Sequence, residues 1–364
     1  MEEPIRVALI GAGQMGLWHA RSLAEIEKAD LAAVVDPDED AGRRAAGLAP
    51  GAYWSAGAEA ILSDPSIRAV VIASPDAAHA GLIEQAAQAG KDIFCEKPLA
   101  TSLAEADAAL AAVASHGVKL QIGFQRRFDP AYQRAREIIA AGELGPVELA
   151  VATTRDALEA ERPNAGMSAK RGSETTSLRP IARQGSGEWR SPWRRRNAAI
   201  FIQITVHDLD SLRFLTGLEV VQVYATASYF GEGPAEEGEV DTAAVVLRFQ
   251  TGALATITDS WRTAYGYDVH VEVMGPRGKV QVGYDRQTAL RHFSAQGVSH
   301  DHVYWYIERF GVAYQREIEH FVDCVARGVA PDVGGADARA AQALAEAAAR
   351  SLREGHPVNV PLPA

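Results

Sequence analysis

The first third of the chain consists of short apolar runs separated by segments whose apolar positions recur at helical spacing. The runs are nearly continuous, which is typical of parallel strands buried on both faces. They are Ile5–Ile10, Leu31–Asp36, Ala69–Ala73, Asp92–Glu96 and Lys119–Gly123. Helices are predicted between them, for example at 79–89 and 102–116. This alternation predicts a doubly wound parallel α/β sheet over residues 1–123.

From residue 124 onward the pattern changes to longer strand-like segments joined by turns. The predicted strands are Val147–Thr153, Glu219–Phe230, Val240–Gln250, Ala253–Trp261, Tyr267–Met274 and Lys279–Val282. Helices are predicted at 130–141, 304–327 and 336–353. Residues 124–364 are therefore expected to form an α+β domain for substrate binding and oligomerisation. Its large open, mostly antiparallel sheet is expected to pack one face on a partner subunit, and its final helix to pack back on the first domain.

A glycine-rich turn joins the first apolar run to the first helix. Its sequence is Gly11-Ala12-Gly13-Gln14-Met15-Gly16. In such a turn, Gly11 permits the tight bend, Gly13 admits a pyrophosphate and Gly16 lets the helix pack closely on the strand. Asp36 stands 20 residues after Gly16, where a carboxylate accepts from a ribose 2′-hydroxyl and repels a 2′-phosphate. We therefore predict a Rossmann domain that binds NAD rather than NADP; the alternative is a glycine turn without a ligand.

Net charge, cysteine count and the lengths of the apolar runs exclude several classes of binding partner and cellular location. The 364 residues carry a net charge of −11, which argues against general binding to nucleic acid or membrane surfaces. Two cysteines, Cys95 and Cys324, are too few for a disulfide framework or a metal cluster. No apolar run approaches the ~20 residues of a membrane span, and the acidic N-terminus enters a strand at once. A reduced, cytoplasmic protein without a signal peptide is expected.

Polar residues gather where the predicted parallel strands end, which is where such sheets bind ligands. Ser74 and Pro75 follow the third run, His79 begins the next helix, and Lys97 follows Glu96 at the end of the fourth run. A lysine beside a positively charged nicotinamide has a lowered pKa, which suits removal of a proton from an alcohol during hydride transfer. The alternatives are a solvated surface lysine and, at 79, a histidine that caps the loop instead of touching the nicotinamide ribose.

Several short motifs along the chain occur together in one known family. They are Gly11-Ala12-Gly13-Gln14-Met15-Gly16, Glu96-Lys97-Pro98, Gly123-Phe124-Gln125-Arg126-Arg127-Phe128-Asp129-Pro130, Val206-His207-Asp208-Leu209-Asp210 and Gly355-His356-Pro357-Val358. On these residues the chain resembles the Gfo/Idh/MocA family of NAD(P)-dependent sugar and cyclitol enzymes, over nearly its whole length apart from about 157–196. The resemblance implies NAD as cofactor and a homodimer or homotetramer.

The resemblance also implies roles for single residues. Lys97 would be the catalytic lysine, His207 would act in catalysis or orient the substrate, and Arg127 and Asp210 would contact the substrate. The residues expected around the cofactor are Gly11, Gly13, Gln14, Met15, Gly16, Asp36, Ser74, Pro75, His79, Glu96, Lys97 and Gln125. The alternatives are a satisfied core histidine at 207 and an ordinary surface ion pair for Arg127.

One position departs from many dehydrogenases of this family. They carry a carboxylate four residues before the histidine, where this chain has Gln203. A glutamine can hydrogen-bond to a substrate hydroxyl but cannot take a proton at neutral pH, which argues against a simple lysine–aspartate–histidine relay. Catalysis is then expected to depend on Lys97 and His207, with a tyrosine such as Tyr132 or Tyr265.

The stretch 157–196 is a second departure. It is low in apolar residues and carries nine Lys or Arg against four Asp or Glu, in a chain that is acidic overall. Arginine forks and backbone N–H groups suit a phosphate, carboxylate or sulfonate, so Lys170, Arg171 and Gly172 are candidate ligands of an anionic substrate. The alternative is a solvated loop or an oligomer contact. The Lys-Arg-Gly element resembles the NAD-dependent sulfoquinovosidases, which use the cofactor without consuming it.

Three functions therefore compete. The favoured one is a redox-neutral, NAD-dependent glycosidase acting on an anionic glycoside such as a sulfoquinovoside. It would oxidise C3, eliminate the C1 substituent, add water and return the hydride. The second is a net NAD-dependent sugar or inositol dehydrogenase. The third is a non-catalytic NAD-binding protein, against which the intact Lys97 and His207 argue.

Overall fold

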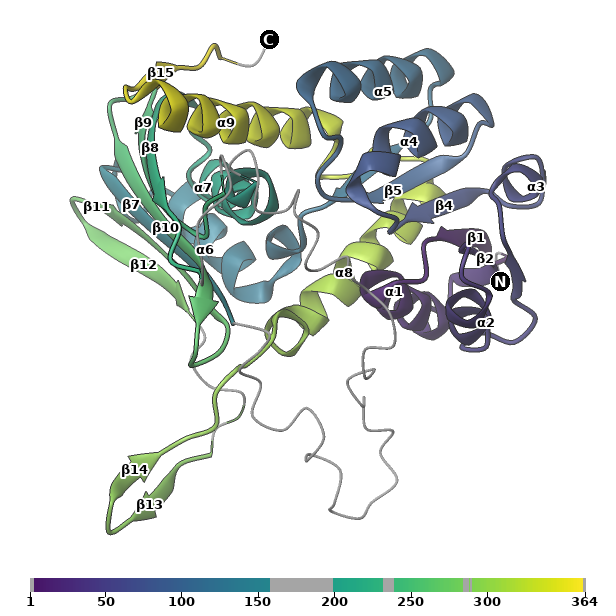
Figure 1. Ribbon diagram of the computed structural model, residues 1–364, viewed down its shortest axis with the longest axis horizontal. Helices are drawn as coiled ribbons and strands as arrows, with labels where there is room; N and C mark the ends of the chain where they lie inside the picture. The colour runs from purple at the N-terminus through teal and green to yellow at the C-terminus, as the bar shows by residue number, and fades with distance from the viewer. Residues whose placement is uncertain (1–2, 158–198, 232–238, 284–287, 289, 363–364) are drawn as a thin grey trace.

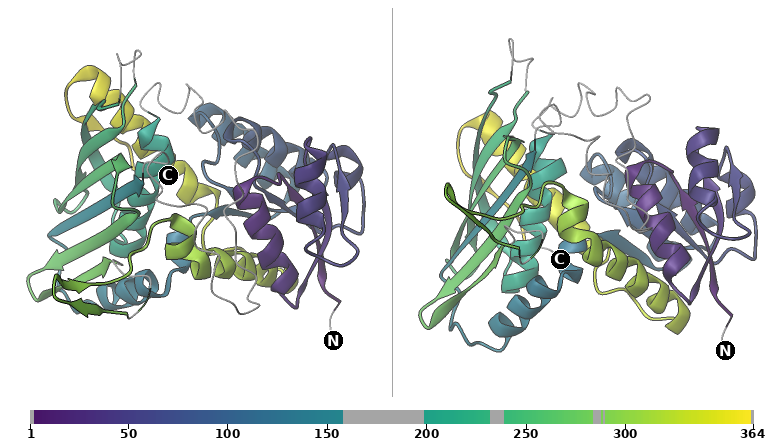
Figure 2. Two further views of the ribbon diagram at one scale, coloured as in Figure 1. Left: turned by 60° about the horizontal axis from the view of Figure 1, so that its bottom comes forward. Right: turned by 90° about the horizontal axis from the view of Figure 1, so that it is seen from below.

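The computed structural model describes residues 3–157, 199–231, 239–283, 288 and 290–362 of the chain. In this part, two large β-sheets stand side by side with helices between and around them (Figures 1 and 2). One sheet belongs to the N-terminal half and the other to the C-terminal half. No helix among these residues combines the length and the apolar character needed to cross a membrane.

The N-terminal sheet is parallel throughout, with strand order β3-β2-β1-β4-β5-β6. Its strands are β1 (Ile5–Ile10), β2 (Ala29–Val35), β3 (Tyr53–Ser55), β4 (Ala69–Ile72), β5 (Asp92–Glu96) and β6 (Leu120–Gly123). Along β1, Ala8 and Ile10 enter one hydrophobic core while Val7 and Leu9 enter another. Burial on both faces explains the continuous apolar runs and confirms the predicted α/β Rossmann domain. The strand order reverses between β1 and β4, where doubly wound sheets bind ligands.

Helices flank this sheet and lead out of it. They are α1 (Gln14–Glu25), α2 (Glu39–Ala46), α3 (Glu59–Leu62), α4 (His79–Gln88), α5 (Leu103–His116) and α6 (Pro130–Ala140). The hydroxyl of Ser102 accepts from Glu105 N at 3.3 Å at the start of α5. The carboxylate of Asp129 accepts from the backbone N–H groups of Ala131 and Tyr132 at the start of α6. Such caps satisfy N–H groups that have no partner within the helix. Because Ser and Asp are preferred N-cap residues, the sequence predicts these two helix starts.

The C-terminal sheet has strand order β12-β11-β7-β10-β9-β8-β15. Its strands are β7 (Leu149–Ala157), β8 (Val220–Ser228), β9 (Thr242–Phe249), β10 (Leu254–Thr263), β11 (Asp268–Gly275), β12 (Gly278–Gly283) and β15 (Val358–Asn359). Neighbouring strands are antiparallel except β7 and β10, which confirms the prediction of a mostly antiparallel sheet. Along β9, Val245 and Leu247 are buried while Val246 and Arg248 are exposed, so the sheet has one covered and one open face.

Three further helices connect the two sheets. They are α7 (Val206–Thr216), α8 (Tyr306–Arg327) and α9 (Gly335–Glu354). Helices α7 and α9 cover one face of the C-terminal sheet, and α8 runs from this sheet to α1 (Figures 1 and 2). Helix α9 also meets the Rossmann domain, since Arg339 pairs with Asp107 and Glu346 Oε1 accepts from Leu103 N at 3.0 Å.

Four short strands were not predicted from the sequence, namely β3, β13, β14 and β15. Strand β3 has three residues, too few to show a period. A hairpin of β13 (His292–Ser294) and β14 (Gly297–Ser299) projects away from the C-terminal sheet (Figure 1). All of its residues are exposed, so no buried face imposes an apolar pattern on them.

Candidate active site

The glycine turn between β1 and α1 is closely packed at two of its three glycines. Gly11 has a φ of 101°, and a Cβ atom there would lie 2.5 Å from the carbonyl oxygen of Ala73. A Cβ atom on Gly16 would lie 1.9 Å from the carbonyl oxygen of Gly11. At Gly13, which directly precedes α1, such a Cβ would meet nothing within 4 Å in the described structure. The turn is thus tight where it packs and open at the helix start, as a pyrophosphate site requires.

Asp36 follows β2 and is held against the same turn. Its Oδ2 accepts from Ala12 N at 2.6 Å and its Oδ1 accepts from Asp38 N at 2.8 Å. Gln14 and Met15 are the first two residues of α1, where backbone N–H groups have no partner within the helix. The carboxylate and these N–H groups therefore flank one turn, in the arrangement that an adenosine diphosphate moiety needs.

His79 links the loops that follow β4 and β5. Its Nε2 lies 2.9 Å from Ser74 O and its Nδ1 lies 2.7 Å from Pro98 O, and the ring is buried. Both ring nitrogens face backbone carbonyls, which favours the loop-capping alternative over contact with the nicotinamide ribose. Pro75 is exposed, and the buried hydroxyl of Ser74 has no hydrogen-bond partner among the described residues. That hydroxyl is one polar group that this loop can offer to a ligand.

Lys97 meets the C-terminal domain at a π-helical turn. The sequence indicated an ordinary helix start here, whereas the structure has the π turn η6 (Phe201–Thr205) leading into α7. Lys97 Nζ donates to the backbone carbonyl oxygen of Gln203 at 3.0 Å. Single π turns occur frequently at functional sites. Two residues that are 106 positions apart in sequence are thereby brought into contact at the end of β5.

His207 lies in the first turn of α7 and is neutral at neutral pH. Burial, and then the positive charges of Lys97 and Arg126, hold the pKa of its imidazole well below 6.5. Its ring packs edge-on against Phe124, with centroids 6.0 Å apart. Its Nδ1 is buried and has no hydrogen-bond partner in the described part of the chain. A satisfied core histidine would have this nitrogen paired, so the geometry supports a histidine that hydrogen-bonds to a ligand.

Glu96 and Gln125 are held by protein groups behind this site. Glu96 Oε1 lies 2.8 Å from Nε2 of the buried His19. Glu317 of α8 lies close to both, and burial together with the charge of Glu96 raises the pKa of its carboxyl well above the usual value. Gln125 Nε2 donates to the hydroxyl of Tyr314 at 3.1 Å. Sequence reasoning missed His19 and Glu317, since each is one of several polar residues in its helix and no motif marks it as buried.

Tyr132, expected to assist Lys97, is placed differently and its catalytic assignment is corrected. It is fully buried beside Phe310, and burial raises the pKa of its hydroxyl to about 12. An enclosed group of such weak acidity is a poor proton donor at neutral pH, so Tyr132 belongs to the core. Tyr265 is 54% exposed and donates its hydroxyl to Asp268 at 2.9 Å.

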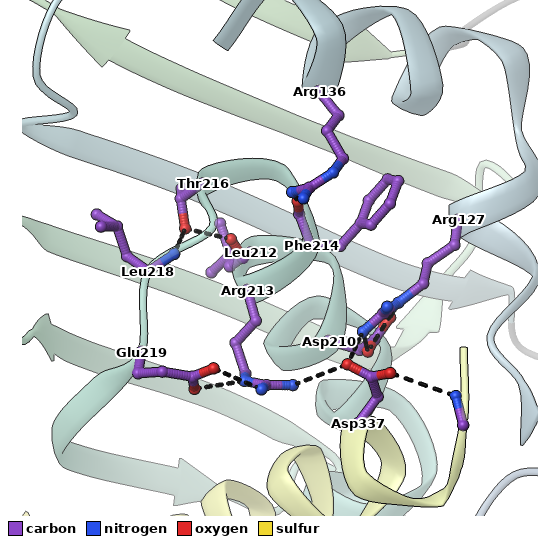
Figure 3. Close-up of polar contacts among 11 residues, drawn as sticks. Arg127, Arg136, Asp210, Leu212, Arg213, Phe214, Thr216, Leu218, Glu219 and Asp337 are labelled. Atoms are coloured by element: carbon purple, nitrogen blue, oxygen red, sulfur yellow. Dashed lines mark hydrogen bonds and ion pairs between the residues drawn. The ribbon is translucent and has the colours of Figure 1, made fainter. Parts of the chain in front are cut away.

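Arg127 and Asp210 form a buried ion pair with each other (Figure 3). Arg127 Nε lies 2.9 Å from Asp210 Oδ2, and its Nη2 lies 2.6 Å from Asp210 Oδ1 and 2.9 Å from Asp337 Oδ1. Arg213 and Glu219 extend the network (Figure 3). These bonds join the segment before α6 to α7 and α9, which supports the ion-pair alternative; the substrate contacts of Arg127 and Asp210 stay a prediction.

Replacing Arg127 by methionine is expected to lower the free energy of unfolding by about 3–5 kcal/mol, because it leaves Asp210 buried without its partner. Chemical denaturation of the variant measures this. Arg134→Ala is the matched control, since its pair with Glu137 is exposed and worth about 0–1 kcal/mol. An Arg127 variant of unchanged stability but raised substrate KM would favour the substrate-contact interpretation.

Lys170, Arg171 and Gly172, the expected ligands of an anionic group, lie outside the described residues. The geometry of the site therefore comes from the ends of the Rossmann strands and from the π turn. These segments place Lys97, Gln203 and His207 together.

Comparison with protein families agrees with this architecture. The model of the oxidoreductase family with an NAD-binding Rossmann fold matches residues 5–124, and that of the GFO/IDH/MocA C-terminal domain matches residues 132–281. The chain belongs to the Gfo/Idh/MocA family. The predicted cofactor, NAD, is thereby confirmed, and the chain is an NAD-dependent oxidoreductase of this family.

Relatives in the Gfo/Idh/MocA family match over nearly the full length. An oxidoreductase of Bacillus subtilis strain 168, YrbE, described as uncharacterized, is 34% identical over 99% of this chain and 98% of its own. The scyllo-inositol 2-dehydrogenase (NAD(+)) of the same strain is 34% identical over 99% of this chain and 97% of its own. The crystal structure of a putative myo-inositol dehydrogenase from Sinorhizobium meliloti 1021 is 33% identical, covers 98% of this chain and 100% of its own, and has a TM-score of 0.85.

These relatives correct the glycosidase hypothesis. That hypothesis rested on the three residues Lys170, Arg171 and Gly172 and on the basic character of the stretch around them. Full-length similarity instead leads to proteins named as inositol dehydrogenases. The redox-neutral sulfoquinovosidase interpretation is therefore wrong by this comparison, and the second hypothesis is the supported one.

Proposed function

We propose that the chain is an NAD-dependent dehydrogenase that oxidises a secondary hydroxyl of a neutral cyclic polyol, with inositols as the first candidates. The observation that carries this proposal is the group at the end of β5. There, Lys97 Nζ is held by Gln203 O, and His207 lies one turn further along the same helical segment. A proton acceptor and neutral hydrogen-bonding groups next to a dinucleotide turn suit oxidation of an alcohol. The names of the full-length relatives add the polyol class.

Each group then has a distinct task in the proposed reaction. NAD, when bound, supplies the acceptor for the hydride. The turn at Gly13 and the carboxylate of Asp36 bind its pyrophosphate and adenosine ribose. The neutral amine of Lys97 takes the proton of the reacting hydroxyl and becomes an ammonium, and the carbonyl of Gln203 orients its Nζ. The neutral imidazole of His207 hydrogen-bonds to a hydroxyl and orients the ring.

The two arginines in the segment before α6 are compensated by carboxylates, so they give no reason to expect an anionic substrate. Arg126 Nη1 pairs with Asp208 at 2.7 Å, and Arg127 pairs with Asp210. His207 is neutral at neutral pH because its pKa is lowered. These groups therefore offer no uncompensated positive charge to a sulfonate or carboxylate.

A panel of substrates tests the proposal. Purified protein with NAD is expected to form NADH, with saturation, on myo-inositol, scyllo-inositol or a related neutral cyclic polyol. NADP should be a much poorer acceptor, since Asp36 repels its 2′-phosphate. To compare neutral with anionic substrates, NADH formation is measured on a sugar and on the same sugar carrying a carboxylate or sulfonate. NADH formed on the anionic sugars alone, or on none of the panel, would contradict the proposal.

We also propose that the chain acts as a homo-oligomer through the open face of its C-terminal sheet. Tyr224 of β8, Val246 of β9 and Leu254 of β10 line one surface there and are each at least 40% exposed. No helix of the described residues covers this face (Figures 1 and 2). An apolar sheet face of this kind is typical of subunit contacts.

A further inference from the structure

A carboxylate that the sequence did not single out contacts the site from the Rossmann domain. Asp76 begins the 3₁₀ turn η1 (Asp76–Ala78), just after the end of β4. Its Oδ2 accepts a hydrogen bond from the side-chain Nε2 of Gln203, in the π turn that precedes α7. The bond joins residues 127 positions apart and spans the two domains. The charge of Asp76 also contributes to raising the pKa of the buried Cys95, which places this carboxylate near the end of β5.

This contact fixes the orientation of the Gln203 amide. A primary amide has a donor end, Nε2, and an acceptor end, Oε1. Turning Oε1 toward Asp76 would oppose two acceptors, so the carboxylate selects the orientation in which Nε2 faces it. The oxygen Oε1 is then directed away from Asp76. The backbone carbonyl of the same residue holds Lys97 Nζ at 3.0 Å, so Gln203 is in contact with both Asp76 and Lys97.

We propose that Asp76 is a positioning residue for hydride transfer: through Gln203 it presents an amide oxygen to a substrate hydroxyl beside Lys97. This inference rests on the proposed dehydrogenase function and adds a specificity element to it. A substrate group that meets Oε1 must be a donor, as a hydroxyl is. A ketone or carboxylate at that place would put its acceptor oxygen against the acceptor Oε1 of Gln203. The site is therefore expected to prefer polyols over their oxidised or acidic analogues.

The test is a set of four variants assayed for kcat and KM on the best polyol. Asp76→Ala is expected to lower kcat/KM about 10- to 100-fold, as loss of a hydrogen bond to a charged group does. Gln203→Glu places two carboxylates in contact and should lose at least as much. In the double variant Asp76→Asn with Gln203→Glu, the asparagine N–H faces a glutamate carboxylate. One donor–acceptor pair and one negative charge are restored, so kcat/KM should recover to within about tenfold of wild type.

Asp40→Ala is the matched control. Like Asp76→Ala, it removes one negative charge from the Rossmann domain, but Asp40 is exposed and lies on α2. It should leave kcat/KM and the NAD dissociation constant unchanged, while Asp76→Ala changes kcat/KM and leaves the NAD dissociation constant within about twofold. An Asp76→Ala variant that equals wild type, or a double variant no better than Gln203→Glu alone, would overturn the proposal.

An activity-free readout separates this inference from the proposed function. The side-chain amide signals of Gln203 in a nitrogen–proton NMR spectrum should shift in Asp76→Ala and not in Asp40→Ala. If wild type oxidises a polyol and these signals do not move, the positioning role is wrong while the dehydrogenase stands. If the signals move and wild type oxidises no polyol, the contact exists but both proposals about function fall.

Discussion

Lys97→Ala is expected to lower kcat about a thousandfold while leaving the NAD dissociation constant within about twofold of wild type. The reason is the place of the Lys97 amine, which accepts a proton in its neutral form. Its Nζ is held at 3.0 Å from Gln203 O, at the end of β5 and beside the neutral His207, where a polyol hydroxyl would lose its proton. The glycine turn that we propose as the pyrophosphate site does not include this side chain. Steady-state kinetics on the polyol and titration of NAD by quenching of tryptophan fluorescence measure the two effects separately.

Two further variants distinguish proton transfer from charge. Lys97→Arg keeps a positive charge but cannot release its proton at neutral pH, so its kcat should stay low. Lys28→Ala removes an exposed lysine whose ion pair with Asp323 lies on the surface, and it should leave kcat unchanged. Full activity in Lys97→Arg would show that the charge alone matters, and full activity in Lys97→Ala would remove this residue from the mechanism.

Gly13→Ala is expected to weaken NAD binding, whereas Gly16→Ala is expected to destabilise the fold. A Cβ on Gly13 meets nothing within 4 Å in the described structure, and its φ of −66° suits alanine, so this variant should fold as wild type does. The methyl group would occupy the place that we propose for the pyrophosphate, so the NAD dissociation constant should rise by about 100-fold or more. A Cβ on Gly16 would lie 1.9 Å from Gly11 O, so this variant should lose about 1–3 kcal/mol or more of folding stability.

Thermal unfolding with and without NAD measures both effects. Gly13→Ala should keep the Tm of the unliganded protein and lose most of the increase that NAD produces, because only ligand bound to the native state raises Tm. Gly16→Ala should already unfold at lower temperature without ligand. A Gly13→Ala variant that binds NAD normally would place the pyrophosphate elsewhere.

The Rossmann half was predictable because each strand is buried on both faces. A continuous apolar run such as Ile5–Ile10 allows few other structures, and the glycine turn and Asp36 follow at fixed offsets. Strand β3 was not predicted, because three residues are too few to show an alternating or continuous apolar pattern. In the second half, apolar segments and their turns were enough to predict the six longer strands, but the sequence pattern of the π turn does not differ from that of a helix start.

The partners of the site residues were not predictable from one sequence. Gln203 stood out only as a missing carboxylate, because Asp76 lies 127 residues earlier and reads as a loop residue after β4. Arg127 was expected at the substrate from the family resemblance, and its bond to Asp337, 210 residues later, could not be predicted from the local sequence. Tyr132 gave no sign of being enclosed, since burial of its hydroxyl depends on Phe310 of a distant helix. Pairing over such distances is set by the tertiary fold rather than by local pattern.

The mistaken glycosidase prediction has a physical lesson of the same kind. A run such as Lys170-Arg171-Gly172 can bind a sulfonate only if the fold directs it into the site, and three residues do not determine that. The groups that the structure does place at the site are Lys97, the neutral His207 and the Asp76–Gln203 pair. Together they suit a hydroxyl-bearing ring without charge.

The most direct test of net alcohol oxidation is a polyol that carries deuterium on the reacting carbon. Incubated with NAD, it is expected to yield one reduced, deuterium-labelled cofactor for each ketone formed, with the rate lowered by the heavier isotope. Cofactor that stays oxidised after many turnovers, with no ketone accumulating, would contradict the account and show that the hydride returns to the substrate.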